Sequence, residues 1–437
     1  MFKKIGSIVK NREVFNRIIF TLVILFVFKI GSSITIPRVD ASSIDFGTTG
    51  GIFELLNMFG GGALSSFSIF ALGVSPYITA SIVVNLLSKG VLPKLEELSK
   101  QGETGKKKID NVTRILALLL AGVQAYGIIL TMQNNYGLTT MSGAAFTLTD
   151  YIYLIIVIVS GTFLLMWMAD QITVKGVGNG LSMIIFAGII MQLPYQISHA
   201  YDQFVAPTGS GNTLFNGIVN FGIYCICYIA LIIAVVFMEK SVRKIPMQYA
   251  ASNSRARTKD VSFLPIKVNS AGVIPVIFAS SILSAPPIIM SFLGYNSSHW
   301  LYKLFSIGAY ANDGVPWGTI FYIILIFVFA YFYTILQMDP AQMAENFQKS
   351  GAYIPGVRPG KETEKYIKKI IYRVTFIGAI FLILLAGVPM FLTMIIGLPS
   401  SIAFGGTGLI IVVGVATETA SQVDGLLAGK EYQGFIE

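Results

Sequence analysis

Long apolar stretches alternate with short polar segments along the whole chain. A helix needs about 20 predominantly apolar residues to cross the hydrocarbon core of a bilayer. Nine stretches have this character, near residues 18–36, 68–88, 112–133, 148–169, 214–238, 270–293, 316–337, 370–390 and 402–423. A tenth, near 180–199, is shorter and has Pro194 in its last turns, where proline disturbs a helix. The pattern predicts an all-α polytopic membrane protein with ten transmembrane helices.

The composition supports this prediction. Of the 437 residues, 54% are hydrophobic and 12% are charged. Soluble domains average about 45–50% apolar and about 25% charged residues. A soluble fold of this chain would have to bury more apolar surface than a globular protein can hide, so the class of soluble proteins is excluded.

The basic residues predict the orientation of the spans. The formal net charge is +9, and Lys and Arg concentrate in the loops that face the inside when the N-terminus is inside. Only Lys29, Arg38 and Lys303 lie elsewhere. The inside segments are 1–17, 89–114, 170–180, 239–269, 338–373 and 424–437. Both termini are therefore predicted to be cytoplasmic, with basic loops at 239–269 and 338–373.

The order of spans divides the chain into two halves. Residues 1–200 hold the first five spans, 201–213 form an external hinge segment, and 214–437 hold the last five. Because each half has an odd number of spans, the halves enter the membrane in opposite senses, as inverted repeats do. This topology by itself also fits a secondary transporter, which remains an alternative at this point.

Residues for catalysis or metal binding are scarce in the predicted spans. Both histidines, His199 and His299, fall in predicted outside loops. The acidic residues Asp150, Asp170 and Glu418 lie near span ends, where such side chains reach the interface. The sequence therefore predicts neither an enzyme nor a bound cofactor or metal.

An unusual segment precedes and enters the second span. A short amphipathic helix at 53–58 is followed by Gly60, Gly61 and Gly62, and the span itself contains Gly73 and Pro76. A broken half-helix at membrane depth is tolerated only where it lines a cavity or is buried in protein. This segment therefore predicts a re-entrant element that closes a cavity.

Long motifs in this order resemble the SecY family, the channel subunit of the general protein translocase. They are NMFGGGAL, ALGVSPYITASI, GETGKKKI, GTFLLMWMADQIT, GVGNGLSMIIFAGI, LPIKVNSAGVIPVIFASSI, NFQKSGAYIPGVRPGKETEKYI and FGGTGLIIVVGV. The resemblance implies two halves around an hourglass pore, with a lateral gate between spans two and seven. It also implies that residues of about 51–66 form a plug.

The resemblance assigns roles to individual residues. A ring of six aliphatic side chains is expected to narrow the pore at Val74, Ile78, Leu181, Ile185, Ile277 and Ile411. Val74 and Leu181 depart from the isoleucine of the other four positions but stay aliphatic. The plug residues are Phe53, Leu56, Met58, Gly60, Gly61 and Gly62. Hydrogen bonds that hold the lateral gate are expected from Asn85, Gln124 and Asn269, although each could also make an ordinary helix contact.

The resemblance also implies partners. The ATPase SecA and the ribosome, the latter through phosphate contacts, are expected at Arg255, Arg257, Lys259, Lys267, Arg358 and Lys361. SecE and SecG are the expected companion subunits, and anionic lipids are expected at the basic loops. The implied function is passage of unfolded preproteins and signal sequences across the plasma membrane, with lateral release of membrane helices. An accessory SecY paralogue with a narrow substrate set remains an alternative.

Overall fold

Ten helices of the structure correspond to the ten predicted spans. The structure, a computed structural model, describes residues 10–41, 44, 52–88, 92–141, 143, 146–205, 211–249, 262–294, 299–305, 316–396 and 405–433. Eight described helices are long and apolar enough to cross a membrane. They are α2 (Arg12–Ser33), α6 (Glu103–Tyr136), α7 (Leu148–Lys175), α8 (Gly180–Val205), α9 (Gly211–Lys240), α12 (Trp317–Gln337), α14 (Lys361–Ile396) and α16 (Gly405–Gln433). The other two are shorter, α4 (Ser75–Leu86) and α10 (Ile274–Phe292), so the ten-helix count is consistent with the fold.

The predicted second span is only partly helical. Residues 60–74 form turns, and α4 begins at Ser75 with Pro76 in its first turn. Gly61, Gly62 and Gly73 have positive φ angles of 69°, 88° and 57°, which glycine adopts without strain. The prediction of a helix from residue 68 is therefore wrong for its first two turns, because α4 begins only at Ser75 and the left-handed backbone of Gly73 is incompatible with a helix.

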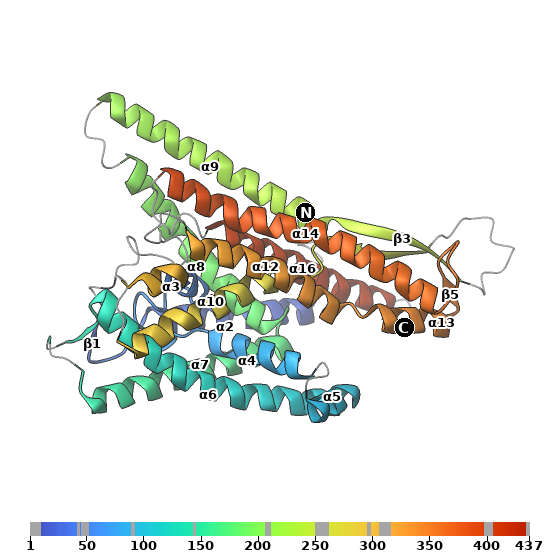
Figure 1. Cartoon of the computed structure of the whole chain (residues 1–437), viewed down its shortest axis with the longest axis horizontal. Coiled ribbons are helices and arrows are strands. Elements are labelled where there is room, and N and C mark those ends of the chain that lie inside the picture. Colours follow the sequence, from blue (N-terminus) through green and yellow to red (C-terminus); the bar gives the residue numbers. More distant parts are fainter. Residues whose placement is uncertain are drawn as a thin grey trace.

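The helices form one bundle around a single large apolar core. Figure 1 shows α6 and α7 along one side and α9 and α14 along the other, with α10 between them. The core takes side chains from α2 through α16. The two halves meet where α10 contacts α4 and α6, and where α16 contacts α8.

Short elements connect the long helices. They are α3 (Ile52–Phe59), α5 (Pro93–Lys100), α11 (Trp300–Phe305), α13 (Pro340–Ser350), and a two-stranded pairing of β1 (Val39–Asp40) with β2 (Thr139–Thr140). Residues 176–179 make the tight turn between α7 and α8 that the glycines predict. There the Gly178 N–H donates to Gln422 Oε1 at 3.1 Å, which joins the turn to α16.

The two basic loops fold together into a unit that sequence analysis treated only as loops. β3 (Val242–Tyr249) pairs antiparallel with β4 (Ser262–Lys267) and with β5 (Ala352–Tyr353). A second apolar core underlies this sheet, formed by Ile245, Ile266, Ile354, Ile367 and Ile371. Figure 1 shows β3 and β5 projecting from one end of the bundle. Residues far apart in the chain thus build one small domain on the end of α14.

Candidate functional site

A short helix, α3, lies inside the bundle without crossing it. Its residues Phe53, Met58 and Phe59 are buried in the main core, and Leu56 packs against that core. The Phe53 ring meets the edge of Tyr136 from α6, with ring centroids 6.4 Å apart. Tyr302 of α11 lies near Tyr136, and the pKa of the Tyr302 phenol is raised by burial and by the neighbouring Tyr136 phenol. The eight-residue helix is thus held in place by apolar packing.

Asn57 fixes the turn that follows α3. Its side-chain oxygen accepts hydrogen bonds from the backbone N–H of Leu64 at 3.1 Å and of Ser65 at 2.9 Å. Its backbone oxygen accepts from the Gly62 N–H at 2.9 Å. One residue therefore satisfies three backbone donors of a non-helical segment, which would otherwise be costly to bury.

The helix α3 and its turn touch both halves of the protein. A Cβ on Gly188 of α8 would lie 2.5 Å from the carbonyl oxygen of Phe59 and 3.0 Å from the amide nitrogen of Gly61. On the other side, a Cβ on Gly408 of α16 would lie 3.1 Å from the Met58 methyl carbon. The absence of a side chain at Gly188 lets α8 and the segment after α3 meet backbone to backbone.

The six predicted ring residues all belong to the main apolar core or pack against it. Four of them are buried there, and the other two are half-buried and pack against it: Val74, Ile185, Ile277 and Ile411, then Ile78 and Leu181. Val74 and Ile78 belong to the start of α4, and the others lie on α8, α10 and α16. Both halves thus contribute to this group, and its arrangement as a ring around a pore stays a prediction.

The structure pairs the predicted gate residues with other partners. Asn85 Nδ2 donates to Ser81 on its own helix at 3.2 Å, and Asn85 is exposed. Asn269 is buried and donates to Glu239 Oε2 at 3.1 Å. Gln124 is half-buried on α6. These hydrogen bonds of Asn85 and Asn269 therefore do not join the two residues to each other.

Apolar contacts between α6 and α10 join the two halves instead. A Cβ on Gly127 would lie 2.3 Å from a methyl carbon of Ile288. The Tyr126 and Phe292 rings lie next to this contact, with centroids 5.2 Å apart. This seam consists of packed side chains from one helix of each half.

The predicted docking residues that the structure describes are exposed. Lys267 ends β4, Arg358 precedes α14, and Lys361 begins it. The Arg358 backbone oxygen accepts a hydrogen bond from the buried Thr363 hydroxyl at 2.9 Å, which fixes this turn. The remaining predicted positions, Arg255, Arg257 and Lys259, lie outside the described residues.

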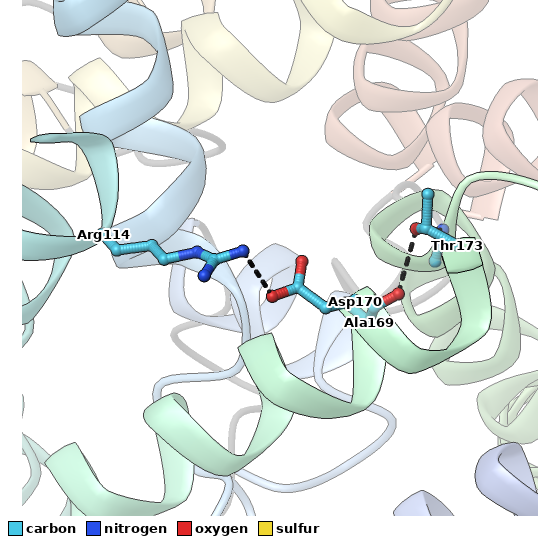
Figure 2. Close-up of polar contacts among 5 residues, drawn as sticks. Arg114, Ala169, Asp170 and Thr173 are labelled. Carbon is cyan, nitrogen blue, oxygen red and sulfur yellow. Dashed lines mark hydrogen bonds and ion pairs between the residues drawn. The ribbon is translucent and has the colours of Figure 1, made fainter. Parts of the chain in front are cut away.

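An ion pair joins the first half of α6 to the last turns of α7. Arg114 Nη2 lies 2.7 Å from Asp170 Oδ2, as Figure 2 shows. On the same turn, the Thr173 hydroxyl donates to the Ala169 carbonyl oxygen at 3.0 Å and accepts from the Gly180 N–H at 2.9 Å. Both groups of the ion pair are about half exposed, so its contribution to stability is small.

Comparison with known proteins decides the family. A family model described as SecY matches residues 68–420. The chain is 45% identical over 443 residues to protein translocase subunit SecY of Bacillus subtilis (strain 168), with 100% of both chains covered. It is 43% identical over 440 residues to protein translocase subunit SecY of Staphylococcus carnosus (strain TM300), covering 100% of this chain and 99% of that one. The chain belongs to the SecY family.

Solved structures show the same fold for this SecY-family chain. One described as the structure of a protein conducting channel matches with a TM-score of 0.66 at 20% identity, covering 94% of this chain and 92% of that one. Sec61 in the canine ribosome-channel complex from the endoplasmic reticulum matches with a TM-score of 0.63 at 18% identity, with the same coverage. The predicted family and SecY-like fold are confirmed, and the chain is a multi-pass membrane protein.

Sequence analysis missed several residues of the SecY-family site. Asn57 follows an amphipathic helix and precedes glycines, which is a signal for a side chain that caps a turn. Gly188 lies within an apolar stretch, and a glycine there destabilises a helix relative to alanine. A glycine at such a position indicates that another segment packs closely against the helix backbone. Glu239 gave a weaker signal, because an acidic residue at the end of a span is ordinarily solvated.

Proposed function

We propose that this chain is the protein-conducting channel subunit of a protein translocase. It passes unfolded preproteins across the plasma membrane and releases transmembrane segments sideways into the bilayer. The observation that best supports the proposal is the buried helix α3, which is too short to span and touches both α8 and α16. In a solved relative, the plug domain is described as stabilising the closed state of the translocation channel and maintaining a membrane seal.

The closed state is proposed to have two seals. The aliphatic group formed by Val74, Ile78, Leu181, Ile185, Ile277 and Ile411 excludes ions, because an apolar constriction dewets. The plug, residues 51–66, lies on the outside of this constriction. Aliphatic side chains are flexible and bind no particular sequence, so the same ring closes around a passing polypeptide.

Opening is proposed to separate the two halves. Residues 1–200 and 214–437 hinge about the external segment 201–213, and the seam between α6 and α10 lies next to the lateral gate between α4 and α10. A seam of apolar side chains suits an opening gate. When an apolar signal helix enters the seam, its side chains replace the contacts between α6 and α10 that are broken. The family assignment favours this reading over the secondary transporter that topology alone allowed; a narrow-substrate paralogue would use the same mechanism.

The partners belong to the same proposal. The exposed basic residues beside the second apolar core suit contacts with ribosomal RNA phosphates or with the ATPase SecA. The translating ribosome or SecA supplies the driving energy. Two of the structurally similar chains belong to ribosome-bound Sec61 and Ssh1 complexes. SecE and SecG complete the complex, anionic lipids bind the basic inside face, and both termini are cytoplasmic.

Photo-crosslinking of a stalled secretory chain tests the proposal. A photoreactive amino acid at Ile78 or at Ile277 is expected to cross-link to the stalled polypeptide. The matched control is Ile226 of α9, whose side chain points outward at 69% exposure. Equal labelling from Ile226 and from the two core positions, or none from the core positions, would contradict a polypeptide path through the centre.

A further inference from the structure

The start of α10 lies in a tight junction with α9, α14 and α16. Val268 and Asn269 connect β4 to α10, and Asn269 is 5% exposed. The Val268 N–H donates to the Ser241 carbonyl oxygen, just after α9, at 2.9 Å. A Cβ on Gly378 of α14 would lie 2.6 Å from the Val268 carbonyl oxygen. Backbone thus packs directly on backbone at this junction, and small displacements are resisted.

Glu239, at the end of α9, is the polar side chain of this junction. Its Oε2 accepts a hydrogen bond from Asn269 Nδ2 at 3.1 Å. Its Oε1 faces α16, because a Cβ on Gly414 would lie 4.0 Å from it. The carboxylate therefore joins α9 to the residue that leads into α10, and it lies beside α16.

The junction lies close to the predicted pore. Gly414 follows Ile411 by three residues on α16, which is a rise of about 4.5 Å. Asn269 precedes Ile277 by eight residues, in the segment that leads into α10. A change at Glu239 therefore acts on the two helices that provide the ring residues of the second half.

We propose that Glu239 is a positioning residue that holds α10 in the closed arrangement through its hydrogen bond to Asn269. The inference rests on the proposed function, because it assumes that α10 also shifts relative to α9 when the lateral gate opens. A buried amide that loses its acceptor destabilises its surroundings. Asn269 thus latches the gate helix to α9 rather than to Asn85 or Gln124 across the gate.

Conductance of the resting channel tests this latch. Glu239→Leu removes the acceptor and is expected to raise ion conductance without substrate by up to about tenfold, since the loss of one buried hydrogen bond shifts the closed–open ratio by up to that order. Glu239→Gln keeps an acceptor oxygen and is expected to remain within about twofold of the unmodified protein. Unchanged conductance in an inserted, folded Glu239→Leu variant would overturn the proposal.

A cross-link separates gate opening from general loosening. In a background with Cys225→Ser and Cys227→Ser, Tyr126→Cys and Phe292→Cys place thiols on the two sides of the α6–α10 seam. A short bifunctional thiol reagent is expected to return the Glu239→Leu conductance to the resting level. A leak that persists after complete cross-linking would assign it to another path and refute the gate latch.

A double variant tests whether the hydrogen bond itself is responsible. If it is, Glu239→Leu combined with Asn269→Leu should leak no more than Glu239→Leu alone, because both remove the same interaction. Additive leaks would refute the pairing. None of these readouts needs a translocating polypeptide, so failed cross-linking to Ile78 and Ile277 would overturn the proposed function while leaving the latch result interpretable.

Discussion

The contact between Gly188 and the segment after α3 gives the sharpest test of the plug. In Gly188→Ala, the new methyl group would lie 2.5 Å from the Phe59 carbonyl oxygen, about 0.9 Å short of the 3.4 Å at which ordinary contact begins. It would also lie 3.1 Å from the Phe59 carbonyl carbon. These are backbone atoms of the plug and cannot rotate away, so either α8 or the plug must move.

The expected size of the effect follows from this overlap. Inserting a methyl group into a tightly packed site costs about 1–3 kcal/mol. If the plug moves to relieve the overlap, the ratio of seated to displaced plug falls by a factor of about 5–150. Purified Gly188→Ala channels in planar bilayers are therefore expected to show a clearly raised conductance without substrate.

Two controls make the result interpretable. Gly222 lies on α9, and a Cβ there would meet no atom within 4 Å, so Gly222→Ala should not leak and should stabilise its helix by up to about 1 kcal/mol. In a channel that lacks residues 51–66, Gly188→Ala should add no further leak, because its clash partner is gone. A Gly188→Ala conductance equal to that of Gly222→Ala would refute the reasoning.

Four further changes test the surrounding structure. Asn57→Ala leaves the Leu64 and Ser65 amides without their acceptor, which costs about 1–3 kcal/mol for each amide that stays unpaired. Resting conductance should therefore rise in Asn57→Ala, and it should rise less in Asn57→Asp, which keeps an acceptor oxygen. Equal conductance in the two variants would contradict this role of Asn57. Ile371→Ala opens a cavity in the second core, at about 2–5 kcal/mol, so trypsin should cleave the cytosolic sheet faster while resting conductance stays unchanged. Gly378→Ala should displace the start of α10 and lower thiol cross-linking between positions 126 and 292, whereas Gly414→Ala, with only 4.0 Å contacts, should not. Arg358→Glu should block SecA-driven secretion without preventing membrane insertion, and normal secretion would remove the docking role of this exposed loop.

The transmembrane helices could be predicted from sequence because the bilayer imposes a length on each apolar stretch. The plug segment was also predictable, since three successive glycines after an amphipathic helix interrupt any span. The exact start of α4 was not predictable from hydropathy, because residues 60–74 are as apolar as a helix would be. Their turns depend on backbone angles at Gly61, Gly62 and Gly73 and on the hydrogen bonds of Asn57.

The sheet formed by β3, β4 and β5 was missed for a different reason. β5 has only two residues, and β3 and β4 carry basic side chains and prolines that are not typical of a strand. The alternation of buried Ile245 and Met247 with exposed neighbours is the period-two signal of a strand. The signal covers few residues, and its buried face needs Ile367 and Ile371 from a helix about 120 positions away.

The hydrogen bond between Glu239 and Asn269 illustrates the limit of sequence reasoning. Asn269 was identified as a gate residue, but its partner depends on how β3 and β4 pair. The register Val242↔Lys267 brings the end of α9 next to the start of α10. Because β3 begins two residues after α9 ends, a displacement of the sheet would be transmitted directly to the end of α9 and to Glu239. The same strand pairing that presents Lys267 at the surface thus positions the proposed latch, which places docking and gating in one connected structure.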